Sequence, residues 1–147
     1  EYAQLAKEVK ADGVHLEQSH VCPIKVRTHV YTWQIIGGTA NTLQECETLL
    51  EKQVDYITLS PFRAVTNEEA TTSILGTNGF TLLTEALQTE TPIMGFGGIT
   101  TTDVKDILAS GISGIAVDEA ITQNFDSIKE FHQLLQASAT EEMRHTF

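Results

Sequence analysis

The sequence predicts an α/β protein with a parallel β-sheet, and two observations indicate this fold class. First, five short apolar runs alternate with segments in which apolar residues recur at helical spacing. Second, the runs begin near positions 13, 34, 56, 92 and 114, so most strand–helix units are about 22 residues long. Runs that are apolar on both faces are typical of parallel strands covered by helices.

Each predicted strand is short and is bounded by Gly, Pro or polar residues. The five strands are Gly13–Leu16, Gln34–Thr39, Tyr56–Ser60, Pro92–Gly97 and Gly114–Val117. Between them, apolar residues spaced three or four apart predict helices. These stripes are Tyr2, Leu5, Ala6 and Val9, then Leu43, Cys46 and Leu50, then Phe80, Leu83 and Leu87, then Val104, Ile107 and Leu108, and finally Phe125, Ile128, Phe131 and Leu135.

Local signals mark where several of these helices begin and end. Thr42 is followed by Glu45, which predicts a capping box, and Thr100 is followed by Asp103 in the same way. Gly111 is expected to stop a helix before the last strand. The polar tail, residues 137–147, has no clear apolar stripe and is expected to fray.

One interval between strands is much longer than the others. It holds a segment from Pro61 to Asn78 that is rich in Thr, Asn and Glu, and long loops in a tight strand–helix repeat are often binding loops. The repeat itself leaves two architectures open. One is an open, doubly wound sheet, and the other is part of an eight-stranded barrel. In both, the chemistry lies at the carboxyl ends of the strands.

Composition narrows the class of function. The chain has 147 residues, enough for one domain, and a formal net charge of −11, which argues against nucleic acid and anionic membranes as partners. No apolar run approaches the roughly 20 residues that a membrane helix needs. Cys22 and Cys46 are interpreted as free thiols of a cytoplasmic protein. The chain opens in a helix without Met, which suggests that upstream sequence is missing.

Five strand-end segments, taken in order, resemble the thiamine phosphate synthase/TenI family. They are residues 11–16 (ADGVHL), 35–42 (IIGGTANT), 55–62 (DYITLSPF), 95–100 (GFGGIT) and 111–117 (GISGIAV). The resemblance runs from about Glu1 to Leu135. It implies a (β/α) barrel of the TIM type, of which this chain supplies strands four to eight, so that residues 1–147 form a partial barrel domain.

The resemblance also implies an activity. The family joins an aminopyrimidine diphosphate to a thiazole phosphate and releases diphosphate, with Mg²⁺ as the expected metal. The implied partners are therefore these two small phosphorylated molecules. A homo-oligomer is also expected, because five barrel strands leave two open edges and an uncovered inner face.

The resemblance assigns roles to several residues. Thr39, Thr66, Gly97 and Gly98 fall at substrate- or phosphate-binding positions, while Met94, Phe96 and Arg63 fall at positions that line the pocket. The residue types support part of this assignment, because glycines between a strand and a helix let bare backbone N–H groups meet a phosphate. Two alternatives are close packing of the strand on the helix at Gly97 and Gly98, and a turn-capping hydroxyl at Thr39. Met94 and Phe96 also fit inward-facing core positions.

Four positions differ from the family pattern. His20 stands where the family has an Asp that binds Mg²⁺, and Glu17 replaces a Gly in the same turn. Glu68 takes the place of a phosphate-contacting Lys, and Glu119 takes the place of a Ser beside the thiazole phosphate. Imidazole suits Mg²⁺ poorly, and a carboxylate beside a phosphate weakens binding. No catalytic residue or metal ligand is therefore assigned, and these four positions predict impaired activity of this chain.

Three further interpretations remain open. His15, Glu17 and His20 are candidates for a transition-metal cluster. The protein is alternatively a non-catalytic family member that binds a thiazole-like or pyrimidine-like ligand or a protein partner, or an independently folded five-stranded binding module. The isomerase chemistry of the TenI branch is not expected, because Asn41 occupies the place of its His and an amide is not a general base.

Overall fold

The computed structural model describes the backbone of residues 2–17, 21–64 and 73–145. Its centre is a five-stranded parallel sheet of β1 (Gly13–Leu16), β2 (Ile35–Ala40), β3 (Tyr56–Leu59), β4 (Ile93–Gly95) and β5 (Gly114–Ile115). The predicted α/β class and parallel sheet are therefore confirmed. Within the described part of the chain, no helix is long and apolar enough to cross a bilayer.

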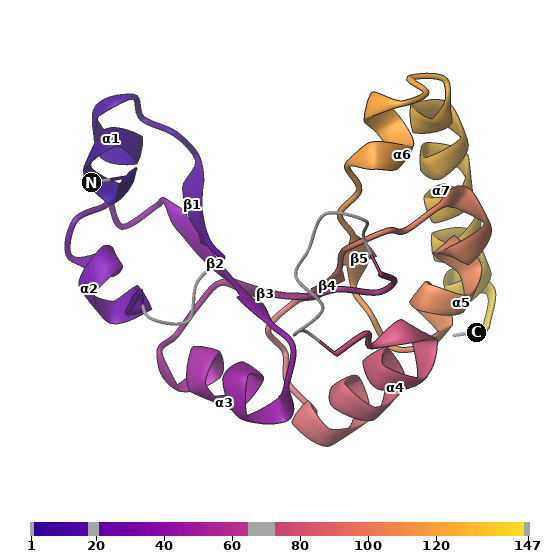
Figure 1. Cartoon of the computed structure of the whole chain (residues 1–147), viewed down its shortest axis with the longest axis horizontal. Helices are drawn as coiled ribbons and strands as arrows, with labels where there is room; N and C mark the ends of the chain where they lie inside the picture. The colour runs from indigo at the N-terminus through magenta and orange to yellow at the C-terminus, as the bar shows by residue number, and fades with distance from the viewer. Residues whose placement is uncertain (1, 18–20, 65–72, 146–147) are drawn as a thin grey trace.

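The strands follow one another in space as they do in the chain, in the order β1-β2-β3-β4-β5. Figure 1 shows the sheet curved into an arc with the helices on its outer side. A doubly wound sheet would reverse its strand order and carry helices on both faces. The described strands do neither, so the doubly wound alternative is wrong.

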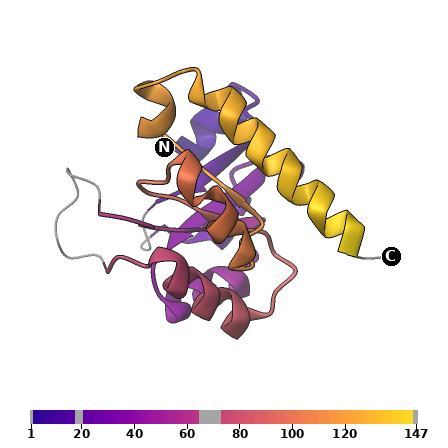
Figure 2. The same ribbon diagram turned by 90° about the vertical axis from the view of Figure 1, so that its right-hand side faces the viewer.

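The predicted helices are present, and two short ones were not predicted. The helices are α1 (Tyr2–Glu8), α2 (Pro23–Arg27), α3 (Leu43–Glu51), α4 (Gly76–Leu87), the 3₁₀ turn η1 (Thr101–Asp103), α5 (Val104–Ala109), α6 (Glu119–Thr122) and α7 (Ser127–His145). The unpredicted helices, α2 and α6, are too short to show a 3.6-residue period. Figure 2 shows α7 as a long helix whose last turns extend beyond the other elements, through the tail that was expected to fray.

The predicted capping box of α3 is confirmed in atomic detail. The Oγ1 of Thr42 accepts from the backbone N–H of Glu45 at 3.2 Å, and Oε2 of Glu45 accepts from the backbone N–H of Thr42 at 3.1 Å. Two N–H groups that would otherwise lack an acceptor at the helix start are thereby bonded. Gly111 follows the end of α5 with a φ of +85°, as expected of a helix stop.

The core lies between the outer face of the sheet and the helices. Ile36, Ile57 and Leu59 point outward from β2 and β3 and are 1%, 0% and 0% exposed. They belong to one cluster of buried residues with Cys46 of α3 and Phe80 of α4. Burial of this face accounts for the apolar runs, because each fully buried aliphatic or aromatic side chain contributes about 1.5–3 kcal/mol.

The amino-terminal edge of the sheet is tied together by polar groups. Oδ2 of Asp55 accepts from the Ile36 backbone N–H and from Nη2 of Arg27, each at 2.6 Å. Burial raises the pKa of Asp55, but the hydrogen bonds from Arg27 and the Ile36 N–H lower it more, so the net direction is down. Asp55 thus has a structural role, joining α2 to the start of β2.

Large apolar side chains are exposed in the part of the chain that precedes β1 and at the start of β2. Trp33 is 54% exposed and stacks on Tyr31 with ring centroids 5.7 Å apart, and Ile35 is 48% exposed. Leu5 and Val9 of the α1 region are 52% and 65% exposed. Exposed apolar groups of this kind are typical of surfaces that contact another element or molecule.

Candidate functional site

The turns that follow the strands all lie at the carboxyl edge of the sheet. Pairing between β3 and β4 continues past the ends of both strands: the Phe62 N–H donates to the Phe96 carbonyl at 2.8 Å, and the Arg63 N–H donates to the Gly97 carbonyl at 3.0 Å. The segment after β3 is thereby held against the glycine turn after β4. Ligands of open and closed parallel sheets alike bind at this edge.

The glycine turn has a backbone that favours glycine. Gly97 and Gly98 have φ values of +95° and +68°, in the left-handed region. A Cβ on Gly97 would lie 2.9 Å from Cα of Pro61, and one on Gly98 would lie 3.1 Å from Cβ of Arg63. Close packing, the alternative interpretation of these glycines, is therefore part of their role. The N–H groups of Gly97, Gly98 and Ile99 have no acceptor among the described residues, so they are available to an oxyanion.

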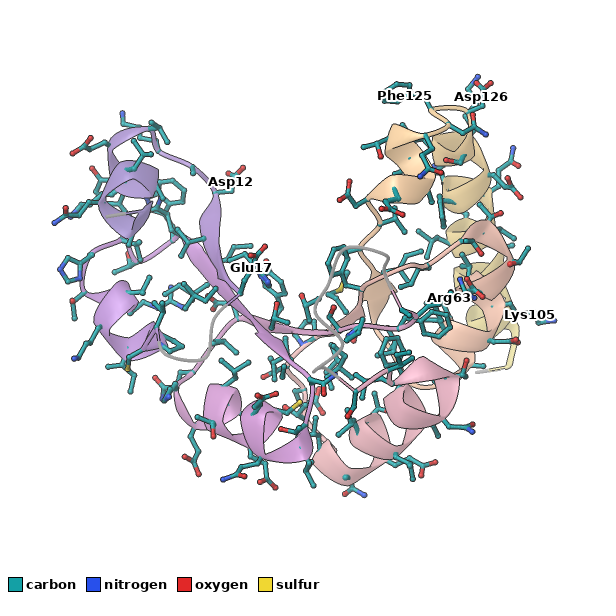
Figure 3. All side chains as sticks on the ribbon, viewed as in Figure 1. Asp12, Glu17, Arg63, Lys105, Phe125 and Asp126 are labelled. Atoms are coloured by element: carbon teal, nitrogen blue, oxygen red, sulfur yellow. The ribbon has the colours of Figure 1, made fainter. Side chains whose placement is uncertain are left out.

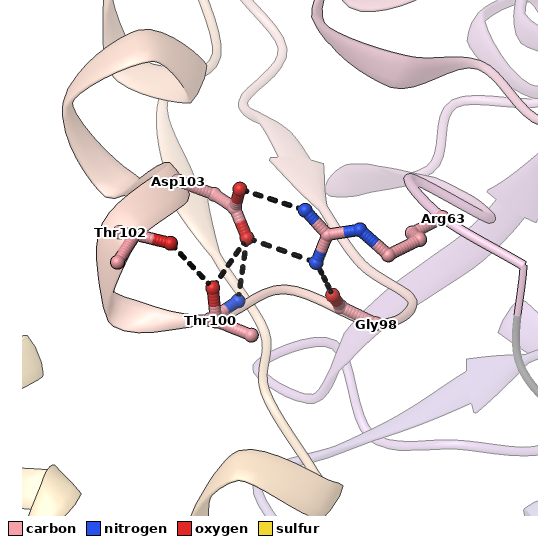
Figure 4. Close-up of polar contacts among 5 residues, drawn as sticks. All are labelled: Arg63, Gly98, Thr100, Thr102 and Asp103. Carbon is pink, nitrogen blue, oxygen red and sulfur yellow. Dashed lines mark hydrogen bonds and ion pairs between the residues drawn. The ribbon is translucent and has the colours of Figure 1, made fainter.

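Arg63 holds this turn to the start of the next helix. Figure 4 shows its guanidinium between Asp103 and the Gly98 carbonyl. Nη1 donates to the Gly98 carbonyl at 2.7 Å and to Oδ2 of Asp103 at 3.2 Å, while Nη2 donates to Oδ1 at 2.9 Å. Burial raises the pKa of Asp103, but the hydrogen bonds from Arg63 and Thr100 lower it more, so this carboxylate stays charged at neutral pH.

A second polar group lies on the inner face of the sheet, where three neighbouring strands each contribute one side chain. Nδ1 of His15 is 2.9 Å from the Tyr56 hydroxyl, and Nε2 is 2.8 Å from Oγ1 of Thr39. The His15 and Tyr56 rings stack with centroids 5.5 Å apart. Gly37 makes this possible, because a Cβ there would lie 2.1 Å from Cζ of Tyr56. We call His15, Thr39 and Tyr56 the inner-face cluster.

The inner-face cluster favours a neutral imidazole. Burial lowers the pKa of His15 below its ordinary 6.5, although the carboxylate of Glu17 acts in the opposite direction. Burial also raises the pKa of Tyr56, so the phenol keeps its proton. One ring nitrogen of a neutral His donates and the other accepts, and both neighbouring hydroxyls accommodate either arrangement. The cluster can therefore present hydrogen-bond donors and acceptors, without net charge, to a polar heterocycle.

The other predicted pocket residues surround these two groups. Met94 and Phe96 are half-buried, and Met94 packs over Gly114, where a Cβ would lie 2.8 Å from its Cε. The amide of Asn41 donates to the carbonyls of Ser60 and Ser73 at 2.8 and 2.7 Å, so it joins the turn after β2 to the returning loop. Thr39 does not cap the next turn, because Thr42 does.

The charge of the site is mostly negative. Glu17 is exposed directly after β1, and Figure 3 shows it on the inner side of the arc. Glu119 is exposed at the first position of α6, after Asp118. Among the described residues of the strand-end turns, Arg63 is the one basic side chain, and its charge is paired with Asp103. His20, Thr66 and Glu68 lie outside the described residues.

No metal centre is assembled by the part of the chain that the structure describes. No group of three or more His, Cys, Asp or Glu side chains there is placed to hold a metal ion. His15 instead bonds to Tyr56 and Thr39, so its two ring nitrogens are occupied by hydroxyl groups. The proposed His15, Glu17 and His20 cluster includes a residue outside the described part of the chain, so it stays a prediction.

Two features of the site were not predicted from the sequence. The first is the inner-face cluster, for which the alternation of side chains along a strand offered a signal: His15, Thr39 and Tyr56 occupy inward-facing positions of three successive strands. The second is the pairing of Arg63 with Asp103, which lie 40 positions apart. The Asp103 carboxylate was expected only to cap the following helix, and it does accept from the Thr100 N–H at 2.9 Å.

Comparisons with known proteins agree with one another. The family model described as thiamine monophosphate synthase matches residues 1–121. A thiamine-phosphate synthase of Flavobacterium psychrophilum is 38% identical over 133 residues, which cover 88% of this chain and 65% of that protein. One of Bacteroides thetaiotaomicron is 32% identical over 138 residues, which cover 92% of this chain and 66% of that protein. The chain thus spans slightly less than two thirds of the length of these relatives.

Solved structures show the same fold. A thiamine phosphate pyrophosphorylase from Pyrococcus furiosus superposes with a TM-score of 0.73 at 21% identity, covering 92% of this chain and 64% of that one. A structure described as native KDPGal superposes with a TM-score of 0.68 at 14% identity, covering 92% of this chain and 65% of that one. At such identities the likeness concerns the fold alone.

Proposed function

This chain belongs to the thiamine monophosphate synthase family, and on that premise we propose that it forms part of an enzyme that couples an aminopyrimidine diphosphate to a thiazole phosphate. The observation that carries the proposal is the Gly97–Gly98 turn, whose N–H groups have no acceptor among the described residues and lie at the carboxyl edge of the sheet. A transferase of two phosphorylated substrates needs such a site for the phosphate that does not react.

In the proposed reaction, the bond between the pyrimidine methylene carbon and the diphosphate oxygen breaks, and the oxygen keeps the electron pair. The thiazole nitrogen then donates its lone pair to the methylene carbon and forms the new carbon–nitrogen bond. We propose that the Gly97–Gly98 turn binds the thiazole phosphate and that the inner-face cluster contacts the pyrimidine. A neutral His15 suits this role, because an imidazolium beside a forming carbocation would oppose it.

We also propose that β1 to β5 are strands four to eight of a closed barrel. Three observations support this: the consecutive strand order, the helices on the outer side only, and the exposed apolar side chains of Trp33 and Ile35 at the start of β2. Additional strand–helix units would cover those side chains and pair the open edges of β1 and β5. The greater length of the relatives leaves room for such units.

Mg²⁺ and a cytoplasmic location complete the proposal. An octahedral Mg²⁺ site usually takes one or two carboxylates together with substrate phosphates, and Glu17 is the carboxylate that directly follows β1. We assign no step to this metal. The free thiols of Cys22 and Cys46 suit a reducing compartment.

The test is an assay of the full-length protein with both substrates and MgCl₂, in which thiamine phosphate and diphosphate are quantified by chromatography. We expect the two products in equal amounts. We expect Gly98→Ala to raise the KM for the thiazole phosphate more than the KM for the pyrimidine diphosphate, because it strains the turn and crowds Arg63. Absence of product from well-folded wild-type protein would refute the synthase assignment. The alternative, a non-catalytic binding protein, gains no positive support from the described residues or the relatives.

A further inference from the structure

We propose that Arg63 is a positioning residue that aims the backbone N–H groups of Gly98 and Ile99 at the thiazole phosphate, and that it does not bind the phosphate itself. The inference rests on the proposed function, because it specifies how the phosphate site of that enzyme is built. It differs from the interpretation suggested by the sequence alone, in which Arg63 falls at a position that lines the pocket.

The hydrogen bonds of the guanidinium are directed away from a ligand. Nη1 and Nη2 donate to the two carboxylate oxygens of Asp103, and Nη1 also donates to the Gly98 carbonyl (Figure 4). The guanidinium carbon lies over the Phe62 ring, 5.3 Å from its centre. These hydrogen bonds use three of the five guanidinium N–H groups. To bind phosphate through the same N–H groups, Arg63 would have to give up a bidentate ion pair, which is among the stronger side-chain contacts in proteins.

The same contacts fix the direction of the turn. Arg63 holds two successive carbonyls: its backbone N–H donates to the Gly97 carbonyl at 3.0 Å, and its Nη1 donates to the Gly98 carbonyl at 2.7 Å. In a planar trans peptide, the C=O and the N–H of the next residue point in opposite directions. Holding these two carbonyls therefore turns the N–H groups of Gly98 and Ile99 to the side away from Arg63.

Those N–H groups are the ones that need a fixed direction. Neither has an acceptor among the described residues, and the glycines at positions 97 and 98 have wide conformational freedom. Without a restraint, the peptide planes would rotate and much of the phosphate affinity would be lost to ordering them. Arg63 supplies that restraint from a segment that lies 35 residues earlier in the chain than Gly98.

Arg63 also neutralises a carboxylate that would otherwise oppose the anion. The Asp103 side chain is 14% exposed and lies at the start of the helix that follows the turn. It is held there by the Thr100 N–H and Oγ1, at 2.9 and 2.7 Å, so it cannot simply turn away. Removal of Arg63 alone would leave this charge uncompensated beside the phosphate site.

The test compares four variants of the full-length protein: Arg63→Gln, Arg63→Lys, Asp103→Asn and the double variant Arg63→Gln/Asp103→Asn. Lys105→Gln is the charge-matched control, because Lys105 is an exposed cation on α5 (Figure 3). We expect Arg63→Gln to raise the KM for the thiazole phosphate roughly ten- to a hundredfold, the effect of losing one charge-assisted hydrogen bond. The KM for the pyrimidine diphosphate should change less than threefold.

Asp103→Asn separates positioning from direct contact. If Arg63 positions the turn, Asp103→Asn weakens thiazole phosphate binding because it loosens the guanidinium, and the double variant binds no worse than Arg63→Gln. If Arg63 instead contacts the phosphate, Asp103→Asn frees the cation and leaves binding unchanged or tighter, which would overturn the proposal. Arg63→Lys should recover only part of the loss, because an ammonium group cannot hold the carbonyl and both carboxylate oxygens in one plane.

A readout that does not need turnover is the ¹H–¹⁵N spectrum of the protein titrated with inorganic phosphate. We expect the Gly98 and Ile99 amide signals to shift in the wild type and in Lys105→Gln, and to shift much less at the same phosphate concentration in Arg63→Gln. Equal shifts in wild type and Arg63→Gln would overturn the positioning role. Failure of the wild type to make thiamine phosphate, with these amide shifts retained, would refute the proposed function but keep the positioning role.

Discussion

Gly37 offers the sharpest test of how the inner-face cluster is built. A Cβ at this position would lie 2.1 Å from Cζ and 2.5 Å from the hydroxyl oxygen of Tyr56. These are atoms of a rigid ring, so the whole phenol must move. The movement would break the 2.9 Å contact of Tyr56 with His15 and the stacking of the two rings. We therefore expect Gly37→Ala to damage both stability and the shape of the site.

The magnitude follows from three contributions. Overpacking of this kind costs about 1–3 kcal/mol, and the lost hydrogen bond adds about 1 kcal/mol. Replacing Gly by Ala also reduces the freedom of the unfolded chain, which offsets about 0.4–1 kcal/mol. The expected net loss in the free energy of unfolding is about 1–3.5 kcal/mol, and each kcal/mol lowers Tm by about 2–4 °C in a domain of this size.

The assay is urea unfolding of the full-length protein followed by circular dichroism, arranged as a double-mutant cycle with Tyr56→Ala. The Gly37→Ala substitution should cost much less in the Tyr56→Ala background, because the ring it collides with is gone. Gly114→Ala is the matched control: its Cβ would meet only the flexible end of Met94, at 2.8 Å, and should be tolerated better. A Gly37→Ala cost that is equal in both backgrounds would refute the reasoning.

Three further outcomes are expected from single groups. Asp55→Asn should cost about 0.5–1.5 kcal/mol at neutral pH, a small value because the Asp55 and Arg27 side chains are 42% and 33% exposed. Since the folded-state pKa of Asp55 is lowered, this difference between wild type and variant in urea midpoints should shrink as pH falls below 3.8. Burial lowers the pKa of His15, so the unfolded chain binds this proton at a higher pH than the folded chain does, and the free energy of unfolding should fall as pH drops below 6.5. His15→Gln should reduce this pH dependence of stability. An NMR titration midpoint of His15 above 6.5 would contradict the lowered pKa. Burial raises the pKa of Cys46 to about 11, whereas hydrogen bonds from backbone N–H groups lower the pKa of Cys22. A thiol reagent should therefore label Cys22 in the native protein and Cys46 only after unfolding.

Much of the secondary structure could be read from the sequence because its causes are local. The strand predicted as Gln34–Thr39 is observed as Ile35–Ala40, and the one predicted as Tyr56–Ser60 is observed as Tyr56–Leu59. The capping box at Thr42 depends on residues three apart, and it forms as expected. Helix α2 was missed, since its five residues are too few to show a helical period.

The candidate site could be predicted only in part. The Gly97–Gly98 turn was recognisable, because glycines between a strand and a helix allow a left-handed backbone and the close approach of a ligand or a packed neighbour. The direction in which the N–H groups of this turn point could not be predicted, because it depends on the side of the turn on which Arg63 lies. The sequence correctly placed Arg63 at the carboxyl edge of the sheet, but it did not reveal that the Asp103 carboxylate forms an ion pair with the Arg63 guanidinium.

The α/β class, the five strands and the glycine turn could be read from the amino-acid sequence, and the strand ends indicated the family. The consecutive strand order, the helices on one side and the two polar groups of the site became visible only in the folded chain. The cause is distance along the chain: the contacts of His15 with Thr39 and Tyr56 join residues 24 and 41 positions apart, and that of Arg63 with Asp103 joins residues 40 apart. Such contacts depend on which strands pair and in what register, and a shift of one residue would turn each side chain to the opposite face.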